Sequence, residues 1–283
     1  MHKVKHVLYI LAFLLVTVGM GVSVWWSIDG EKGADYVVET NVPFAPFEFY
    51  ENREIVGVDV EIVNRVAAKI NKTIQIKNVE FDVIIDNVEA GRIADAGAAG
   101  LTITPARSEK VNFTIPYYNS VQYVIYSSEM PPSLRDDHVV WEALAGSRLG
   151  SQIGSTGYLF IEDEIENGVL TGTGTVLKGI DSHQLAADAI KAHIIDYAVA
   201  DELAAKFIVE KNPGLMALPL YYSGVTREED EPVEESYAIA VNKDKTELLE
   251  AFNEVLAEMM TENDEGETEI DRLVLKYMGL SNE

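Results

Sequence analysis

The chain of 283 residues contains no cysteine, and its 22 basic residues are outnumbered by 47 acidic ones. Without cysteine there is no disulfide framework, no thiolate metal site, no thiol nucleophile and no lipid attachment through an N-terminal cysteine. The formal net charge of −25 argues strongly against a nucleic-acid partner, because binding to phosphates needs a basic surface. The acidic runs 228–231 and 261–269 are expected to be solvated loops.

Motifs for metal binding and catalysis are also scarce. Outside the first 28 residues the histidines are His138, His183 and His193, and their spacing does not match a metal site. No Gly-x-Ser-x-Gly sequence occurs, which argues against a serine hydrolase. The Gly-Ser-Thr-Gly turn at 154–157 lacks the lysine and the spacing of a nucleotide-binding loop. We therefore expect no metal and no cofactor.

The first 28 residues differ from the rest of the chain. Lys3 and Lys5 precede an uncharged run, residues 7–28, that ends in Trp25-Trp26. This pattern predicts a hydrophobic targeting helix, with everything after it exported. The run is long enough to span a bilayer, and no convincing cleavage site follows it. A retained anchor on the extracytoplasmic face of the membrane is favoured over a cleaved signal, which would leave the protein secreted or periplasmic.

From residue 35 onward, strand-like and helix-like patterns alternate. Asp59 and Asp82 are expected to cap helices that end near Asn71 and at Gly91. Further helices are expected at 182–193, 201–211 and 246–260, and strands at 36–40, 74–76, 95–99, 121–126, 148–153, 195–200 and 237–241. The alternation predicts an α/β fold with mostly parallel sheets. We expect two lobes: residues 34–124 with 237–283, and residues 127–234, joined by hinge strands near 122–127 and 234–238.

Polar residues follow several of the predicted strands. In open parallel sheets, ligands bind beyond the carboxyl ends of the strands. The residues at these ends are Asn41, Gly100, Thr102, Ser155, Thr156 and Asp201. The sequence thus predicts one site that several strands build together.

Two charged residues suggest what the site binds. Arg107 follows the Gly-Leu-Thr-Ile-Thr loop at 100–104, and a guanidinium fork with loop N–H groups suits a carboxylate; the alternative is an ordinary surface arginine. Asp201 ends the Ile-Asp-Tyr-Ala-Val-Ala-Asp segment and can hold an ammonium, cap the next helix, or do both. A cation for a carboxylate and an anion for an ammonium indicate an amino acid.

Two aromatic residues are candidates for the walls of the site. Phe44 lies in a Pro-Phe-Ala-Pro-Phe segment, where proline prevents a regular strand, and Phe81 precedes Asp82. Each can form part of a pocket or of the ordinary core, because the two look alike in sequence.

With these residues in view, residues 35–280 resemble the extracytoplasmic solute-binding proteins of polar amino-acid ABC importers. The motifs that carry the resemblance occur in the family's order. They are Pro-Phe-Glu-Phe at 46–49, Ile-Val-Gly-Val-Asp-Val-Glu at 55–61, Val-Glu-Phe-Asp at 79–82, Gly-Leu-Thr-Ile-Thr-Pro-Ala-Arg at 100–107, Val-Asn-Phe-Thr-Ile-Pro-Tyr-Tyr at 111–118 and Gly-Ser-Thr-Gly at 154–157.

The resemblance implies a periplasmic-binding-protein fold of type 2, with two hinged lobes that close over one free amino acid. It implies that Arg107 clamps the ligand's α-carboxylate, with help from Thr102, Ser155 and Thr156. Asp201 and the Gly100 carbonyl would hold the α-ammonium.

The resemblance also implies how the ligand's side chain is held. Phe44 and Phe81 would sandwich it, while Asn41 and Gln152 would reach its polar end. Relatives with cationic or amide ligands often carry an acidic residue where this chain has Asn41. A neutral polar amino acid is therefore favoured. The Gly- and Thr-rich segment 167–179 has no assigned role.

The predicted function is amino-acid binding without catalysis, by a monomer that docks on an ABC permease. The first alternative is a dehydratase on the same fold, which would need a further acid or base such as Glu48 or His183. Asp201 argues against it, since a ligand without an amine does not need a carboxylate that holds an ammonium. The second alternative is a sensor module that binds an amino acid and signals to a membrane partner.

Overall fold

The computed structural model describes residues 33–280, so the targeting segment predicted at 1–28 lies outside the described residues. Within 33–280, none of the helices combines the length and the apolar character that a membrane crossing needs. Two main sheets and a hairpin of β2 (Phe49–Glu51) and β3 (Glu54–Val56) make up the strands of this part of the chain.

The first sheet joins residues from both ends of the chain. Its order is β4 (Ile74–Asn78), β1 (Tyr36–Thr40), β5 (Ala96–Gly97), β15 (Ala240–Val241) and β6 (Asn112–Phe113). β1 pairs in parallel with β4 and β5, whereas β15 is antiparallel to β5 and β6. The carboxyl ends of β1 and β5 therefore lie at one edge, as the strand–helix alternation predicts.

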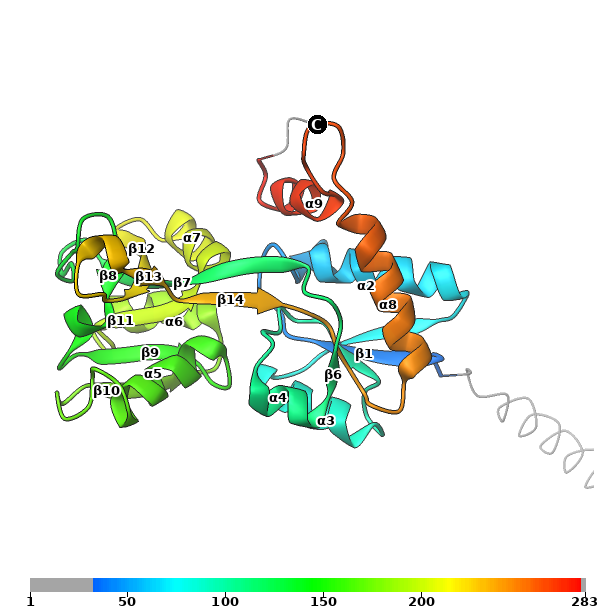
Figure 1. Cartoon of the computed structure of the whole chain (residues 1–283), viewed down its shortest axis with the longest axis horizontal. Coiled ribbons are helices and arrows are strands. Elements are labelled where there is room, and N and C mark those ends of the chain that lie inside the picture. Colours follow the sequence, from blue (N-terminus) through cyan, green and yellow to red (C-terminus); the bar gives the residue numbers. More distant parts are fainter. Residues whose placement is uncertain (1–32, 281–283) are drawn as a thin grey trace, which may run out of the picture. The chain divides into compact units, whose positions relative to one another are not determined.

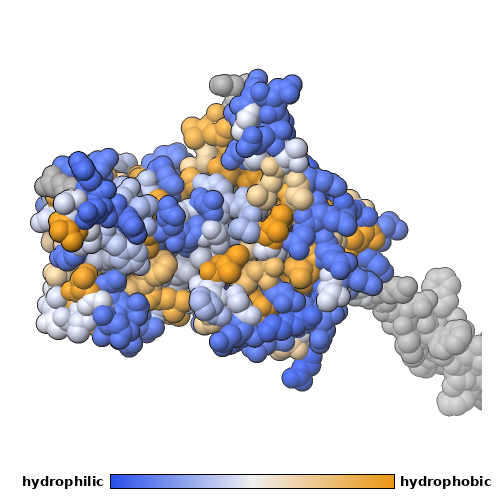
Figure 2. All heavy atoms as spheres, viewed as in Figure 1, coloured by the Kyte–Doolittle hydropathy of each residue, from blue (hydrophilic) through white to orange (hydrophobic). Residues whose placement is uncertain are grey.

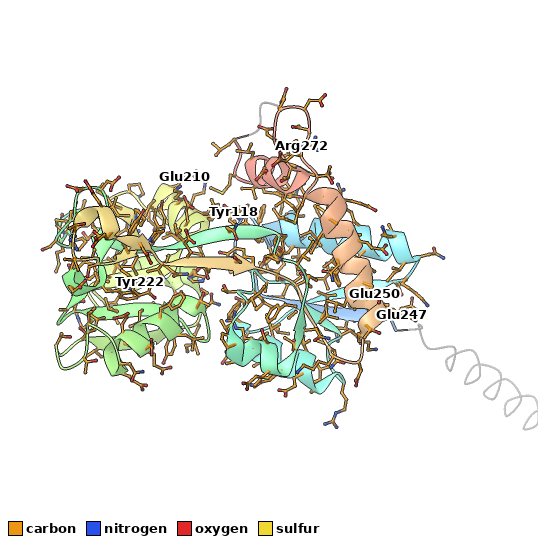
Figure 3. The ribbon with its side chains drawn as sticks, viewed as in Figure 1. Tyr118, Glu210, Tyr222, Glu247, Glu250 and Arg272 are labelled. Atoms are coloured by element: carbon orange, nitrogen blue, oxygen red, sulfur yellow. The ribbon has the colours of Figure 1, made fainter. Side chains whose placement is uncertain are left out.

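The helices that accompany this sheet are α2 (Val58–Ile70), η1 (Phe81–Val83), α3 (Ile84–Ala90), α4 (Pro105–Lys110), α8 (Thr246–Met259) and α9 (Glu269–Tyr277). Ile62 of α2, Phe252 of α8 and Val38 of β1 are fully buried in one core. Hydrophilic side chains cover much of the outer face over α3 and α8 (Figure 2). Glu247 and Glu250 are exposed on that side of α8 (Figure 3).

The second sheet contains the longest strand of the described chain, β7 (Tyr118–Ser127). Its order is β10 (Val176–Ile180), β9 (Arg148–Gln152), β11 (Tyr197–Asp201), β7, β12 (Leu215–Tyr222) and β13 (Glu231–Pro232), with β14 (Glu234–Tyr237) on β7 and β8 (Val139–Val140) on β12. β9 is parallel to β10 and β11, and β7 is antiparallel to its partners. Its helices are η2 (Trp141–Leu144), α5 (Thr156–Glu166), α6 (His183–Lys191), α7 (Glu202–Lys211) and η3 (Arg227–Glu229).

Two strands run side by side between the sheets (Figure 1). β14 pairs antiparallel with β7, in a register that sets Tyr237 against Tyr118 and Glu234 against Val121. These are the strands expected to act as hinges. The lobe boundaries that the sequence suggests stay a prediction.

Two of the expected helix caps are wrong, although the helix ends are confirmed. Asn71 and Gly91 follow α2 and α3 in the left-handed conformation. Asp59, however, lies inside the first turn of α2, whose N-cap is Gly57. Gly57 has a φ of 135°, and a Cβ there would lie 2.1 Å from the carbonyl oxygen of Phe47, so only glycine fits. Asp82 lies within η1, which precedes the start of α3.

Other differences between the predicted and observed elements arise where tertiary contacts determine the local structure. The strand expected at 237–241 is divided between the end of β14 and β15, and α9 was not predicted. Thr268 and Asp271 form a capping box that begins α9, so the acidic loop ends before residue 269. In the other acidic run, the Asp230 side chain is only 1% exposed; it forms an ion pair with Arg135 and a hydrogen bond with His138. The prediction that this whole run is solvated was therefore wrong. Most of segment 167–179 forms turns that lead into β10.

Candidate functional site

A small cavity lies where the carboxyl ends of strands from both sheets meet. It has about 10 Å³ of space for the centre of a water molecule, which is room for roughly one water. Nine of the ten predicted site residues line it, and the tenth, Arg107, does not. The lining residues are Asn41, Phe44, Glu48, Phe81, Ala99, Gly100, Thr102, Gln152, Ser155, Thr156, His183 and Asp201.

Arg107 lies just behind Thr102, facing a neighbouring hollow that Phe81, Asp82 and Gly154 also line. Its side chain is well buried in α4, and its guanidinium donates from Nη1 to the Thr102 carbonyl (2.8 Å) and from Nη2 to the Gly154 carbonyl (2.9 Å). Its Cζ also lies 5.6 Å from the centre of the Phe81 ring. Burial lowers the pKa of Arg107 from its usual value, against the opposing effects of Glu235 and Asp201. The guanidinium is held in place by backbone oxygens, which fixes its direction.

Asp201 ends β11 and occupies the N-cap position of α7, but its side chain makes no capping hydrogen bond. Its Oδ1 accepts from Gln122 Nε2 (2.5 Å) and its Oδ2 accepts from the Tyr237 hydroxyl (2.7 Å). The carboxylate is thus turned toward the cavity rather than the helix end. A helix cap alone does not explain this side chain.

The Thr102 and Thr156 hydroxyls meet at one carboxylate that the sequence did not suggest. Both donate to Oε2 of Glu235, each at 2.6 Å, and Gln122 Nε2 donates to Oε1 at 2.6 Å. Burial, and then the charge of Asp201, raise the pKa of Glu235 well above its usual value. The carboxylate and its three donors form a buried network, in which both carboxyl oxygens have partners but Gln122 Oε1 has none among the described residues.

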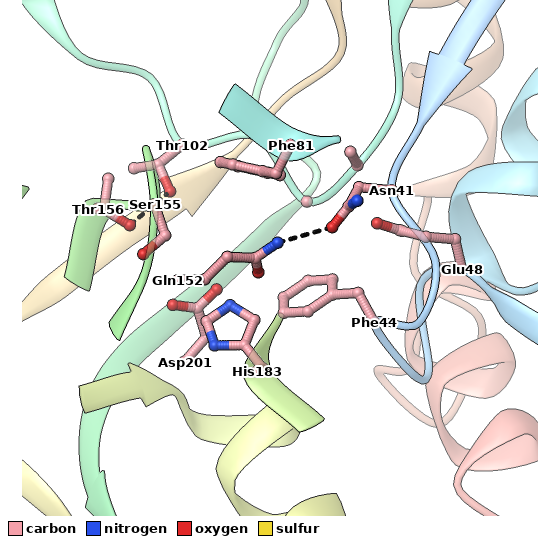
Figure 4. A pocket seen from close by; sticks show the side chains of 12 residues that line it. Asn41, Phe44, Glu48, Phe81, Thr102, Gln152, Ser155, Thr156, His183 and Asp201 are labelled. Carbon is pink, nitrogen blue, oxygen red and sulfur yellow. Dashed lines mark hydrogen bonds between the residues drawn. The ribbon is translucent and has the colours of Figure 1, made fainter. Parts of the chain in front are cut away.

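Asn41 and Gln152 touch across the other end of the cavity (Figure 4). Gln152 Nε2 donates to Asn41 Oδ1 at 2.7 Å, and Asn41 Nδ2 donates to the carbonyl of Val79 at 2.7 Å. Both amides that were expected to reach a ligand's polar end therefore contact each other in this structure.

Phe44 belongs to the cavity wall and to the core at once. Its ring lies 5.6 Å from those of Phe47 and His183, measured between centroids. Gly100 has a φ of 54°, and a Cβ there would lie 2.5 Å from a Phe44 ring carbon. The loop can approach the ring so closely because residue 100 is glycine.

Ser155 is the N-cap of α5 and accepts from the Tyr158 N–H at 3.2 Å. Thr156 is the first residue of that helix, so the hydroxyl turn at 154–157 does lie at a helix N-terminus. N–H groups at such a position favour an anion.

Glu48 is the residue whose place in the site sequence reasoning missed, since it was considered only as an acid or base. Its side chain is 0% exposed, and in the described structure neither carboxyl oxygen has a hydrogen-bond partner. Figure 4 shows the carboxyl group pointing into the cavity, near Asn41. Burial raises its pKa well above the usual value, and nearby Asp59 and Asp201 add to the effect. Its place within the Pro-Phe-Glu-Phe motif at 46–49 was the available signal.

Two further buried groups complete the site. Asp59 accepts from the Gly100 N–H (3.0 Å) and the Tyr117 hydroxyl (2.5 Å), and burial raises its pKa to about 6. It therefore fixes the Gly100 loop from behind. His183 begins α6, and burial lowers its pKa, which keeps the ring uncharged at neutral pH.

The cavity brings together groups that suit opposite charges. Threonine hydroxyls and helix N–H groups can donate to a carboxylate, while Asp201 and Glu48 can accept from cations. Together with two α/β sheets linked by paired strands, this defines a binding protein for a small polar molecule.

The chain belongs to the bacterial extracellular solute-binding proteins, family 3, whose model matches residues 36–279. It is similar to the ABC transporter arginine-binding protein 1 of Escherichia coli, at 29% identity over 252 residues that cover 88% of this chain and 91% of the relative.

Solved structures agree with this assignment. The amino-acid ABC transporter substrate-binding protein AbpA of Streptococcus pneumoniae, bound to L-arginine, has a TM-score of 0.71 at 26% identity, covering 88% of this chain and 96% of that one. An ancestral arginine-binding protein bound to glutamine has a TM-score of 0.68 at 29% identity, covering 86% and 97%. The expected periplasmic-binding-protein fold of type 2 is confirmed.

Proposed function

We propose that this chain binds one free amino acid outside the cytoplasmic membrane and delivers it to the permease of an ABC importer. The proposal rests on one observation: the Asp201 carboxylate and the Thr102 and Thr156 hydroxyls line the same cavity. Two relatives support it: one is named an arginine-binding extracellular protein and the other an ABC transporter arginine-binding protein.

We assign the groups of the ligand as follows. Arg107, Thr102, Ser155 and Thr156 hold the α-carboxylate, because the three hydroxyl residues line the cavity and the Arg107 guanidinium lies directly behind Thr102, donating to its carbonyl. To reach the ligand, the Arg107 guanidinium would exchange its hydrogen bond with the Gly154 carbonyl for one with the carboxylate.

Beside them, Asp201 and the Gly100 carbonyl hold the α-ammonium, which the ligand carries on the same carbon as its carboxylate. Phe44 and Phe81 flank the ligand's side chain, and Asn41 and Gln152 reach its polar end. These amides would exchange their mutual hydrogen bond for bonds to the ligand.

Binding requires the cavity to open, since it has room for roughly one water. Two contacts between the predicted lobes close it, Gln152 to Asn41 and Arg107 to Gly154. In addition, Glu235 of the hinge strand β14 joins Thr102 of one lobe to Thr156 of the other. We propose hinge motion at β7 and β14, with lobe 1 made of 34–124 and 237–283 and lobe 2 of 127–234. A ligand that touches both lobes favours the closed state.

Two classes of ligand side chain are candidates. Asn41 favours a neutral polar one. Glu48 favours a cation, because it is a buried carboxyl without a partner that faces the cavity, and an opposite charge offsets the cost of burying it. The solved relatives hold arginine in one case and glutamine in another, so both classes are tested.

The protein acts without catalysis, as a monomer anchored at the membrane through residues 1–28. The dehydratase alternative uses Glu48 or His183 as acid or base and predicts turnover of a prephenate-like acid. The sensor alternative predicts amino-acid binding without uptake. Loss of uptake when the gene is deleted, in a strain that depends on the ligand, would separate an importer from a sensor.

A thermal-shift screen of the purified protein against the twenty amino acids, ornithine and citrulline tests the proposal. A ligand at 100 times its Kd adds about 2.7 kcal/mol of stability, which raises Tm by several degrees. One or two clear hits are expected. A folded, ligand-free sample with no shift from any of these compounds would contradict it.

A further inference from the structure

Glu235 occupies the hydroxyl groups that the proposed ligand carboxylate needs. It lies on β14 and is 5% exposed. One of its carboxyl oxygens accepts from Thr102, in the loop after β5, and from Thr156, the first residue of α5, each at 2.6 Å. The two hydroxyl oxygens are themselves only 3.4 Å apart. A single carboxylate oxygen of the protein thus joins both sides of the cavity.

The number of protons on these groups limits what they can do. Each threonine hydroxyl carries one proton and can donate one hydrogen bond. While both protons point to Glu235, the hydroxyls face the cavity with lone pairs, and lone pairs repel a carboxylate. A ligand carboxylate can therefore accept from either hydroxyl only after Glu235 has released it.

We propose that Glu235 is a positioning residue that couples ligand binding to proton uptake. A proton from solvent binds to Oε2 of Glu235, and the resulting O–H donates to one threonine oxygen. That threonine then turns its own proton toward the ligand's carboxylate. The negative charge of Glu235 is removed as the ligand's charge enters. The inference rests on the proposed binding of an α-amino acid.

The groups around Glu235 favour this exchange. Gln122 Nε2 donates to Glu235 and to Asp201, which places two carboxylates at one amide. The guanidinium of Arg107 interacts with the negative charge of Glu235. When Glu235 is neutral, the guanidinium can attract the ligand's carboxylate instead. The Tyr237 hydroxyl donates its proton to Asp201, so it does not donate to Glu235. Burial and the charge of Asp201 raise the pKa of Glu235, whereas the hydrogen bonds from Thr102 and Thr156 lower it. When a threonine turns to the ligand, its hydrogen bond no longer stabilises the charged form of Glu235, so protonation becomes more favourable.

Other groups at the cavity also titrate, so the test must separate them. Glu48 and Asp59 have raised pKa values and His183 a lowered one. The variant E235Q removes one charge at the network. E234Q removes the same charge from the neighbouring residue, which is exposed on the same strand, and serves as the matched control. E48Q removes the carboxyl group of Glu48, which lines the cavity.

The experiment is titration calorimetry of the full chain with L-arginine and with L-glutamine, between about pH 5.5 and pH 7.5, in buffers of different ionisation enthalpy. The wild type and E234Q are expected to take up a proton on binding and to gain affinity as the pH falls, by at most about tenfold per pH unit. E235Q is expected to lose that uptake and to bind at least as tightly at the upper pH. E48Q is expected to retain it.

Binding without proton uptake in the wild type, or unchanged uptake in E235Q, would overturn the role of Glu235 while leaving amino-acid binding intact. Absence of binding by any amino acid would overturn both. If E235Q does not fold, Thr156→Val provides a second test. Removing one donor disfavours the charged form of Glu235, so proton uptake on binding should decrease; unchanged uptake would contradict the coupling.

Discussion

The two ends of the cavity handle buried charge in opposite ways. At one end, Asp201 and Glu235 accept from Gln122, Tyr237 and two threonines. At the other end, both oxygens of Glu48 lack a partner among the described residues. Unpaired buried polar groups are rare because each costs free energy. We call the first the satisfied end because its carboxylates are paired, although Gln122 Oε1 there has no partner among the described residues, and the second the unsatisfied end. In the proposed binding mode, the satisfied end recognises what all amino acids share, and the ligand's own side chain supplies the missing contact at the unsatisfied end.

The largest effect is expected at the satisfied end. Arg107→Ala should reduce ligand affinity by about 2–5 kcal/mol, because it removes one partner of a buried charge pair. Calorimetry with the best ligand of the thermal-shift screen measures it. Arg92, which is exposed, provides the control: Arg92→Ala should bind normally. Equal affinity in the two variants would mean that Arg107 does not bind the ligand.

Asp201→Asn comes next. The amide keeps the size of the side chain but loses the charge, so affinity should fall by about 1.5–3 kcal/mol, the usual contribution of a hydrogen bond to a charged group. The matched change Asp188→Asn, at an exposed position of α6, should have no effect. If Asp201→Asn binds as tightly as Asp188→Asn, the ammonium is held elsewhere.

At the unsatisfied end, the unpaired carboxyl of Glu48 should lower the free energy of unfolding at neutral pH. A carboxyl whose folded-state pKa is raised binds its proton more tightly in the folded state, so the folded state loses stability as the pH rises from the unfolded pKa through the folded one. Glu48→Gln removes this loss. Its free energy of unfolding should exceed that of the wild type by about 1–3 kcal/mol at neutral pH and match it near pH 4.

Urea unfolding at both pH values measures this difference. Glu54→Gln, at an exposed position of the nearby hairpin, should show none at either pH. A Glu48→Gln protein that is less stable than the wild type at neutral pH would mean that Glu48 has a stabilising partner.

The smallest effect concerns ligand choice. Citrulline has nearly the shape of arginine but a neutral side chain. If Glu48 selects a cation, the wild type should prefer arginine to citrulline, and Glu48→Gln should reduce the preference by about 1 kcal/mol or more. Competition calorimetry measures the ratio. A wild type that binds glutamine and citrulline better than arginine would instead support the neutral class expected from Asn41.

Much of the fold could be predicted because its signals are local. Apolar periodicity marks α2 and α8, and left-handed residues end helices at Asn71 and Gly91. Asp59 was mistaken for a cap because aspartate at a helix start usually is one. Here it faces inward to Gly100 and Tyr117, which lie more than forty positions away in the chain.

The site was predictable to the extent that its residues follow strands. Asn41, Gly100 and Asp201 do, and they line one cavity. Glu235 follows no such rule, because it lies within an edge strand, and only the packing of β14 on β7 brings it to Thr102 and Thr156. The direction of the Arg107 guanidinium, likewise, depends on the Gly154 carbonyl from a distant turn.

One measurement tests amino-acid recognition most directly. The best ligand of the screen is titrated into the wild-type protein beside two derivatives, its N-acetyl form, which lacks the ammonium, and its α-carboxamide, which lacks the carboxylate. Because Asp201 and Arg107 each need a charged partner, both derivatives should bind at least about tenfold more weakly, which corresponds to about 1.4 kcal/mol. Equal affinity for the free amino acid and either derivative would contradict the binding site described here.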